Sequence, residues 1–201
     1  NLKDTTIDVR QQFAAAQQLQ QIDKTYKDLY KMQSVAQLLA QQTPVFIKSY
    51  GINGLATLTF RGASAAQSAV LWNGVPILNP ALAVADVSLL NTGLFDNLAL
   101  QYGGSAALFG SGNVGGALAL GNNDPTFTQS KDAAITLGVG SFGRKDFAAK
   151  ASYQNRRWRV AFRSFYQQAN NDFDYLNTIG KKQKLSNAQL NAVGALLSVD
   201  Y

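Results

Sequence analysis

Two hydrophobic patterns divide the chain near position 123. Before it, apolar residues occur in short runs that are separated by glycine, asparagine and proline. After it, apolar residues alternate with small or polar residues in longer runs. Strict alternation is typical of strands with one apolar face, whereas short interrupted runs are typical of mixed helices and strands. The pattern predicts an α+β N-terminal part followed by long antiparallel strands.

The N-terminal part predicts several short elements. Ser34 can cap a helix that ends before Pro44, because a residue that precedes proline is disfavoured in the helical conformation. A weaker helical period surrounds Tyr26. Asn73-Gly74 predicts a tight hairpin turn, since both residue types accept positive φ. We expect strands at 45–47, 55–61, 69–72 and 97–102 and a short helix at 86–90.

The C-terminal part predicts about four strands, within 132–141, 147–153, 158–166 and 192–201. Segments of ~10 alternating residues are the length of membrane-barrel strands, and aromatic residues near their ends suit the membrane boundaries. A soluble β-sandwich also alternates. Arg159 and Arg163 favour the barrel, because both would be costly in a sandwich core and both suit a wet lumen. An open edge cannot persist in hydrocarbon, so we expect the barrel to be incomplete in this chain.

Composition narrows the possible chemistry. The 201 residues include no cysteine and no histidine, and the 12 acidic residues are scattered, so we expect no enzyme, metal site or cofactor. The glycine-rich stretch 102–120 lacks the lysine of a phosphate loop. The net charge of +6 would suit an acidic partner, but we interpret the basic runs at 156–163 and 181–184 as a solvated turn and loop and expect no nucleic acid.

The order of five motifs resembles the plug domain of TonB-dependent outer-membrane receptors. The motifs are SVAQLL at 34–39, PVFIKSYG at 44–51, LTFRG at 58–62, LWNGVPI at 71–77 and GGSAALFGSGNVGGALAL at 103–120. Their signature residues are Arg61, Gly62, Gly74, Gly103, Gly110, Gly115 and Gly116. The resemblance covers 34–122 well and 2–33 loosely. The wording of the motifs is more similar to Bacteroidetes-type receptors and, within these, to the cobalamin-receptor group.

The resemblance implies an N-terminal segment with the start of the plug (1–33), a plug core (34–123) and the first barrel strands (124–201). It implies ligand-gated uptake of a scarce nutrient, cobalamin or an iron chelate, across the Gram-negative outer membrane. The implied partners are a TonB-type energy-transducing protein, outer-membrane lipid, the small-molecule cargo and a surface lipoprotein. A TonB box would lie within 2–9, at Asp4, Thr5, Thr6, Ile7, Asp8 and Val9. Alternatively, residues 6–9 form the first plug strand.

The resemblance also places ligand contacts on the apical plug loops. The candidates are Tyr50, Asn53, Ser64, Gln67, Asn73 and Asn79. Each can instead serve only its own turn. The family commonly has Glu and Arg around the last plug strand, where this chain has Ala99 and Tyr102, so these positions cannot supply the family's ion cluster with the barrel wall. Two alternative functions stay open: a plug-type subunit of an envelope complex that signals or binds partners without cargo, and a soluble β-rich adhesin.

Overall fold

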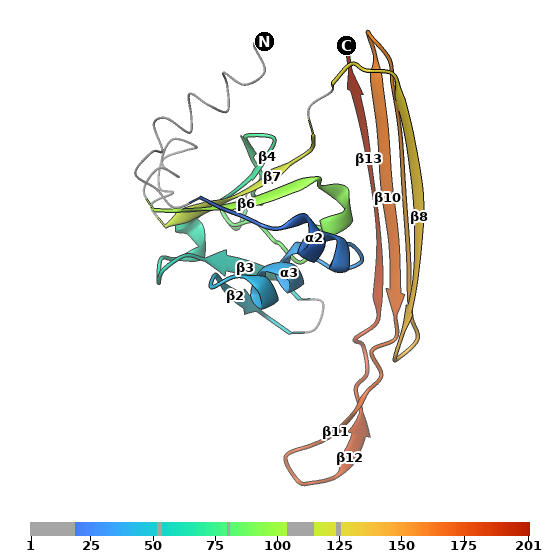
Figure 1. Cartoon of the computed structure of the whole chain (residues 1–201). Helices are drawn as coiled ribbons and strands as arrows, with labels where there is room; N and C mark the ends of the chain where they lie inside the picture. The colour runs from blue at the N-terminus through green and yellow to red at the C-terminus, as the bar shows by residue number, and fades with distance from the viewer. Residues whose placement is uncertain (1–18, 52–53, 80, 104–114, 124–125) are drawn as a thin grey trace.

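A plug of short strands and helices lies against the concave face of a curved sheet of long strands, which we call the wall (Figure 1). The computed structural model describes residues 19–51, 54–79, 81–103, 115–123 and 126–201. The change of architecture after residue 123 follows the change in hydrophobic pattern.

The plug is built on a five-stranded sheet with the strand order β1-β6-β7-β4-β5. Strands β4 and β7 are parallel, and the other neighbours are antiparallel. A separate antiparallel hairpin joins β2 to β3. The strands are β1 (Leu19–Gln21), β2 (Phe46–Ser49), β3 (Ala56–Thr59), β4 (Ser68–Trp72), β5 (Val75–Pro76), β6 (Asn97–Tyr102) and β7 (Gly116–Gly121).

Within the described residues, the plug also contains two α-helices and two 3-10 helices. They are α2 (Lys24–Leu29), α3 (Val35–Gln42), η1 (Ala65–Gln67) and η2 (Thr92–Leu94). Ser34 caps α3 as expected, in a reciprocal capping box in which Ser34 Oγ accepts from the Gln37 amide at 3.3 Å. In the part of the chain that the structure describes, no helix is both long and apolar enough to cross a membrane.

The prediction of a short helix at 86–90 is wrong. This segment forms a turn, because Asp86 Oδ1 accepts hydrogen bonds from the amides of Ala56 and Ser88, both at 3.0 Å, and from the Ser88 hydroxyl at 2.6 Å. An aspartate that bonds nearby backbone amides offers the chain an alternative to the helical ladder. The same bonds fix the segment beside the start of β3.

One hydrophobic core joins α3, β3 and the plug sheet. Leu38 and Leu39 are fully buried, and Phe60 is 1% exposed. The packing of Phe60 requires glycine at position 116. A Cβ atom on residue 116 would lie 2.7 Å from Phe60 Cγ and 2.6 Å from the Gln101 carbonyl oxygen. Burial of one such aromatic or aliphatic side chain contributes about 1.5–3 kcal/mol.

The wall consists of four antiparallel strands of 11 residues each, in the order β13-β10-β9-β8. They are β8 (Ser130–Gly140), β9 (Arg144–Gln154), β10 (Arg159–Ala169) and β13 (Leu190–Asp200). At ~3.3 Å per residue, each is long enough to cross a hydrocarbon core of ~30 Å. Ile135, Leu137 and Val139 face away from the plug and are 71%, 75% and 90% exposed. The expected strands and their apolar outer face are therefore present.

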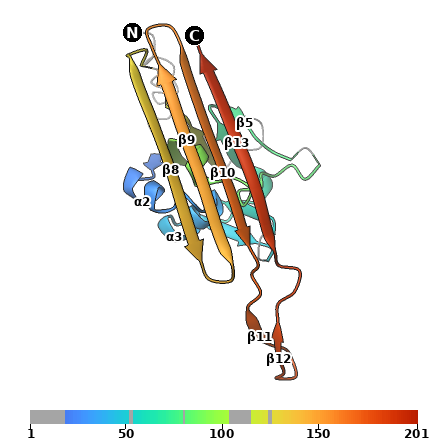
Figure 2. The same ribbon diagram turned by 90° about the vertical axis from the view of Figure 1, so that its right-hand side faces the viewer.

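The two ends of the wall differ (Figure 2). At one end a long connection carries the hairpin of β11 (Asp174–Leu176) and β12 (Lys182–Lys184) beyond the wall. At the other end β9 and β10 are joined by the short turn 155–158. Membrane barrels have short periplasmic turns and longer extracellular loops. We therefore call the end with β11 and β12 the outer end and the opposite one the inner end.

Candidate functional site: the contact between plug and wall

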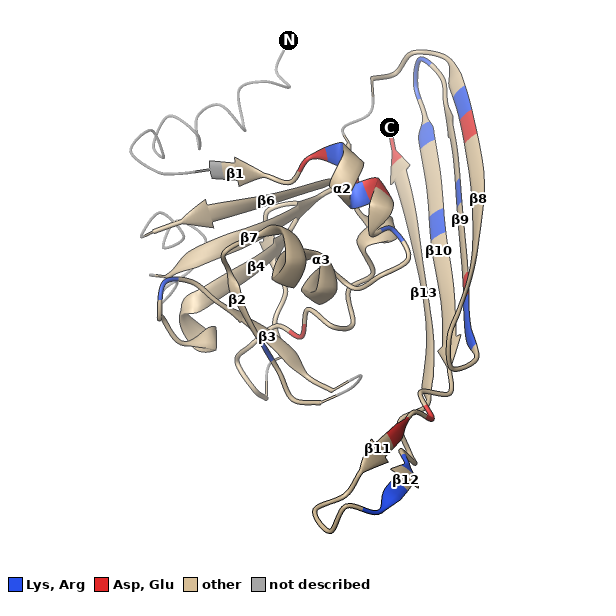
Figure 3. Cartoon of the chain, turned by 60° about the horizontal axis from the view of Figure 1, so that its bottom comes forward, with Lys and Arg blue, Asp and Glu red and all other residues tan. Residues whose placement is uncertain are grey.

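Three side chains of β10 reach from the wall to the plug. Arg159, Arg163 and Gln167 are spaced by four residues, and because side chains alternate along a strand they share one face. Figure 3 shows the basic positions of β10 along the strand beside the plug. The bonds join Arg159 Nη1 to the Asn123 carbonyl at 2.5 Å, Arg163 Nη2 to Asp96 Oδ2 at 2.6 Å and Gln167 Nε2 to the Met32 carbonyl at 2.5 Å. We call these three residues the β10 ladder.

The central member of the β10 ladder is a buried ion pair. The side chains of Arg163 and Asp96 are 9% and 22% exposed. Asp96 Oδ2 also accepts from the Asn123 amide at 2.9 Å, so one carboxylate oxygen joins the wall to the loop that leaves β7. Within the described residues, Arg163 Nη1 is buried and makes no hydrogen bond. Removal of either charge would leave the other in a low-dielectric setting.

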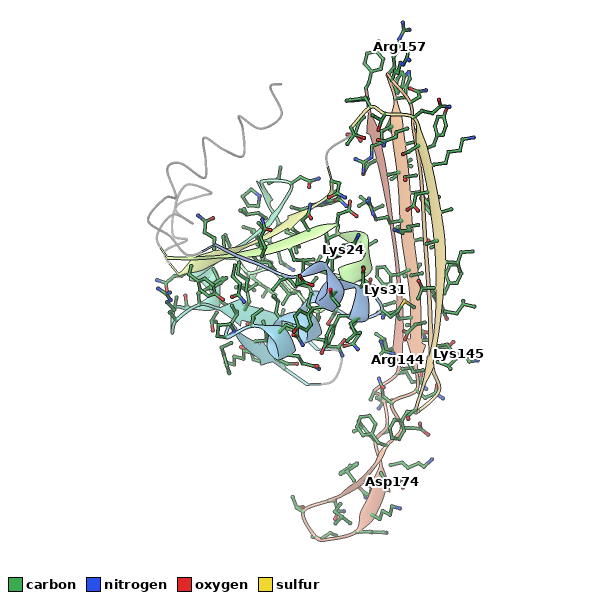
Figure 4. All side chains as sticks on the ribbon, in the orientation of Figure 1. Lys24, Lys31, Arg144, Lys145, Arg157 and Asp174 are labelled. Carbon is green, nitrogen blue, oxygen red and sulfur yellow. The ribbon has the colours of Figure 1, made fainter. Side chains whose placement is uncertain are left out.

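A second wall strand reinforces the contact near the turn between α2 and α3. Arg144 of β9 donates to the Met32 carbonyl at 2.9 Å, so this oxygen accepts from both Arg144 and Gln167. Asp146 lies two residues along β9 and accepts from Arg144 Nε at 2.7 Å. The carboxylate orients the guanidinium group toward the plug. Figure 4 labels Arg144 on the side of the wall that faces the plug.

Lys27 of α2 lies in the same polar layer. Its ammonium group donates to the Phe95 carbonyl at 3.3 Å. Burial lowers the pKa of Lys27 from its usual 10.5, and the charges of Asp28 and Asp96 offset part of this effect. The plug side of the contact therefore holds a cation for which burial is costly.

Tyr102 occupies a position where the family commonly has a charge. Its hydroxyl donates to Gln20 Oε1 at 2.7 Å and so fastens β1 to β6. Its ring meets Phe60 edge to face, with centroids 5.6 Å apart. Burial raises the pKa of the Tyr102 hydroxyl. Tyr102 thus contributes to the plug's own edge, and Asp96 supplies the ionic contact with the wall.

The structure does not bring the predicted ligand residues into one cluster. Tyr50 follows β2, a strand on the side of the plug nearer the outer end (Figure 1), and is 56% exposed. Ser64 and Gln67 lie at η1, and Asn73 lies at the other end of β4. Six residue steps along β4 separate Gln67 from Asn73 by roughly 20 Å. Asn79 lies on a loop that projects from the side of the plug, and Asn53 lies outside the described residues (Figure 2).

Several of these residues have local structural partners. Gln67 Oε1 accepts from the Ser64 amide at 3.0 Å, and Asn79 Oδ1 accepts from the Ala81 amide at 2.9 Å. Asn73 Oδ1 accepts from the Asn122 amide at 3.0 Å. Their contact with a ligand stays a prediction; Gln67 and Asn79 stabilise their own turns, and Asn73 links its turn to the residue after β7.

The plug signature residues support turns and close packing. Asn73 and Gly74 have φ of 47° and 82°, as expected for the predicted hairpin turn between β4 and β5. Arg61 and Gly62 also have positive φ, of 47° and 81°. The Gly103 amide donates to the Gly115 carbonyl at 3.2 Å. Gly110 and the candidate TonB box, Asp4 to Val9, lie outside the described residues.

Sequence reasoning placed Arg159 and Arg163 in a lumen but found neither Asp96 nor Gln167. The four-residue spacing of Arg159, Arg163 and Gln167 could have identified a polar inner face. Nothing in the sequence identifies the Met32 and Asn123 carbonyls as acceptors, because backbone oxygens carry no residue-specific pattern.

The structure has relatives among solved outer-membrane proteins. The ferripyoverdine receptor of Pseudomonas aeruginosa is 18% identical, with a TM-score of 0.65 over 79% of this chain and 21% of its own. The FrpB iron transporter of Neisseria meningitidis is 14% identical, with a TM-score of 0.69 over 90% and 28%. The copper transporter OprC is 22% identical, with a TM-score of 0.63 over 83% and 26%. This chain spans about a quarter of the length of these proteins, and at such identities the likeness shows the fold alone.

Sequence comparison gives the family. No curated protein matches the chain. The family model described as TonB-dependent Receptor Plug Domain matches residues 11–117, more than half of the sequence. The match extends from before β1 into β7 and so includes most of the plug sheet. The chain therefore belongs to the family of TonB-dependent receptor plug domains.

Proposed function

We propose that the chain forms the plug and first wall strands of an outer-membrane receptor that imports a scarce nutrient. The observation that carries this proposal is the polar contact between plug and wall. Water can replace hydrogen bonds and ion pairs when they break, whereas separation of a large apolar interface exposes hydrocarbon. A plug held by the β10 ladder blocks the lumen at rest and can be released without loss of its own core.

The cargo we propose is a metal chelate, either cobalamin or an iron chelate, bound at the outer end. The ferripyoverdine receptor and the copper and iron transporters among the solved relatives make a metal-containing cargo the class to test first. Near the outer end, the Lys48 ammonium group lies 4.8 Å from the centroid of the exposed Tyr50 ring. The ammonium group suits the anionic groups of an iron chelate, and the exposed ring suits stacking against a flat part of either cargo.

Release would begin at the N-terminal edge of the plug. Within the described residues, strand β1 pairs with β6 over three residues, and Ile22 adds one further amide bond to the Leu98 carbonyl at 2.9 Å. A pull on the preceding segment reaches this short edge before it reaches β6 and β7. We place the TonB box within 2–9, where an extended segment can add as a strand to a TonB-type protein.

Deletion of residues 2–9 tests the transport proposal in the whole receptor in cells. We expect binding of radiolabelled cobalamin or ferric chelate to persist and energy-dependent uptake to disappear. A matched control scrambles 11–16, which keeps the composition and leaves the candidate box intact. Undiminished uptake by the deletion variant would contradict the proposal. Failure to bind any chelate would instead favour a plug-type subunit that acts through partner binding.

A further inference from the structure

A group of basic and aromatic side chains gathers at the inner end of the wall. Arg156 and Arg157 occupy the turn between β9 and β10 and are exposed. Lys131 on β8 lies opposite Tyr153 on β9, with the ammonium group 5.6 Å from the ring centroid. Trp158 follows the two arginines. We call these five residues the rim cluster, and Figure 4 shows Arg157 at the inner end, pointing away from the wall.

The cations of the rim cluster differ from most other basic residues of the wall, although Lys145 and Lys181 also have no ion pair among the described residues. Arg159 pairs with Asp200 at 3.5 Å, and in the outer hairpin Lys182 and Lys184 pair with acidic residues at 2.8 and 3.3 Å. Among the described residues, no carboxylate lies within ion-pair distance of Lys131, Arg156 or Arg157. Their positive charge is therefore available to an external anion.

The aromatic members place the cluster at a membrane boundary. Tyr153 lies on the same outer face as Ile135 and Val139 and is 42% exposed, and Trp158 is 46% exposed. The Trp158 ring contacts that of Tyr201, which directly follows β13, with centroids 4.6 Å apart. Half-exposed tyrosine and tryptophan rings at the end of a membrane-facing strand sit at the level of lipid headgroups.

A depression beside the two arginines has the size for a headgroup. It has a volume of about 770 Å³ and lies between residues 127–129 and the turn 155–158. Arg156, Arg157 and Trp158 are among the residues that line it. Guanidinium groups bind phosphate oxygens through paired hydrogen bonds, and an indole ring packs against the adjoining glycerol and acyl carbons.

We propose that the rim cluster binds the phosphate headgroup of an anionic phospholipid in the inner leaflet of the outer membrane. The inference rests on the proposed membrane placement, in which the short turn 155–158 faces the periplasm. The bound lipid neutralises the unpaired cations and fixes the height of the wall in the membrane. The partner is a membrane phospholipid, because the aromatic members would add nothing to the binding of free phosphate.

Native mass spectrometry of the whole receptor in a neutral detergent tests the inference. Phosphatidylglycerol and phosphatidylcholine with the same acyl chains are titrated against the wild type and two double variants. The test variant is Arg156→Gln/Arg157→Gln. The control is Lys181→Gln/Lys182→Gln, which removes the same charge at the outer end. Lys131→Gln is a further single variant, and millimolar inorganic phosphate is the competitor.

We expect phosphatidylglycerol to bind the wild type at least about 10-fold more tightly than phosphatidylcholine. Each basic residue near a lipid surface contributes about 1 kcal/mol to binding. We therefore expect the affinity for phosphatidylglycerol to fall about 30-fold in the test variant and about 5-fold in Lys131→Gln, and to stay unchanged in the control. Equal binding of the two lipids, equal loss in the control or full displacement by phosphate would overturn the inference. A receptor that stays in the aqueous phase without detergent would contradict the proposed function itself.

Discussion

Replacement of Asp96 by asparagine removes the charge that holds Arg163 while it keeps the shape of the side chain. Loss of one partner of a fully buried ion pair costs about 3–5 kcal/mol, and exposed pairs contribute about 0–1 kcal/mol. Asp96 and Arg163 are 22% and 9% exposed, and asparagine still offers an acceptor oxygen. We therefore expect the free energy of plug opening to fall by about 2 kcal/mol, which corresponds to about 30-fold more frequent opening.

Amide hydrogen exchange detects this opening in the folded receptor at β6, because Asp96 directly precedes this strand and the end of the strand opens locally once the pair with Arg163 no longer holds it to the wall. We expect Asp96→Asn to speed exchange in Asn97–Tyr102 by about 30-fold. Asp132→Asn is the matched control, since Asp132 pairs with Lys150 at 3.2 Å and both side chains are more than half exposed. Its effect should stay below about 5-fold. Equal rates in the two variants would refute the assignment of Asp96 as the anchor of the plug.

Further predictions concern the plug itself, and chemical denaturation of the receptor measures each of them. Burial lowers the pKa of Lys27, so the unfolded chain binds the Lys27 proton more tightly than the folded chain does. The charged lysine therefore lowers the free energy of unfolding. This loss of stability is fully present below the folded pKa and fades as the pH rises toward 10.5. Lys27→Met should abolish this alkaline gain in stability. Gly116→Ala should cost at least about 2 kcal/mol through overlap with Phe60, whereas Gly121→Ala, whose Cβ would meet nothing closer than 3.8 Å, should cost under about 1 kcal/mol. Gly74→Ala, at φ 82°, should cost about 1 kcal/mol.

Local sequence patterns predicted those elements of the fold in which one or two residues determine the backbone conformation. Ser34 begins α3, and Asn73-Gly74 forms the turn between β4 and β5. Alternation located all four wall strands, because a strand with one lipid face must repeat every two residues. The segment 86–90 does not form a helix because Asp86 accepts hydrogen bonds from Ser88 and from the amide of Ala56, and the bond to Ala56, 30 residues earlier, lies outside any local pattern.

The candidate site was less accessible to sequence reasoning. The pairing of Asp96 with Arg163 joins residues 67 apart, and it depends on where the wall stands relative to the plug. At the two positions where the family commonly has charges, this chain has Ala99 and Tyr102. The resemblance therefore did not predict Asp96, which directly precedes β6, as the charged residue. The candidate ligand residues Gln67 and Asn73 were chosen by loop position, and the structure separates them along β4.

A reversible cross-link between plug and wall tests the central claim most directly. The variant Asp96→Cys/Arg163→Cys, in a receptor without other cysteines, replaces the ion pair by two thiols. A short bifunctional reagent with a reducible spacer then links these two thiols covalently. We predict that the cross-linked receptor still binds the metal chelate in cells, that uptake stops, and that reduction of the spacer restores it. Uptake at the uncross-linked rate while the link is intact would contradict the proposal that the plug must leave this contact for transport.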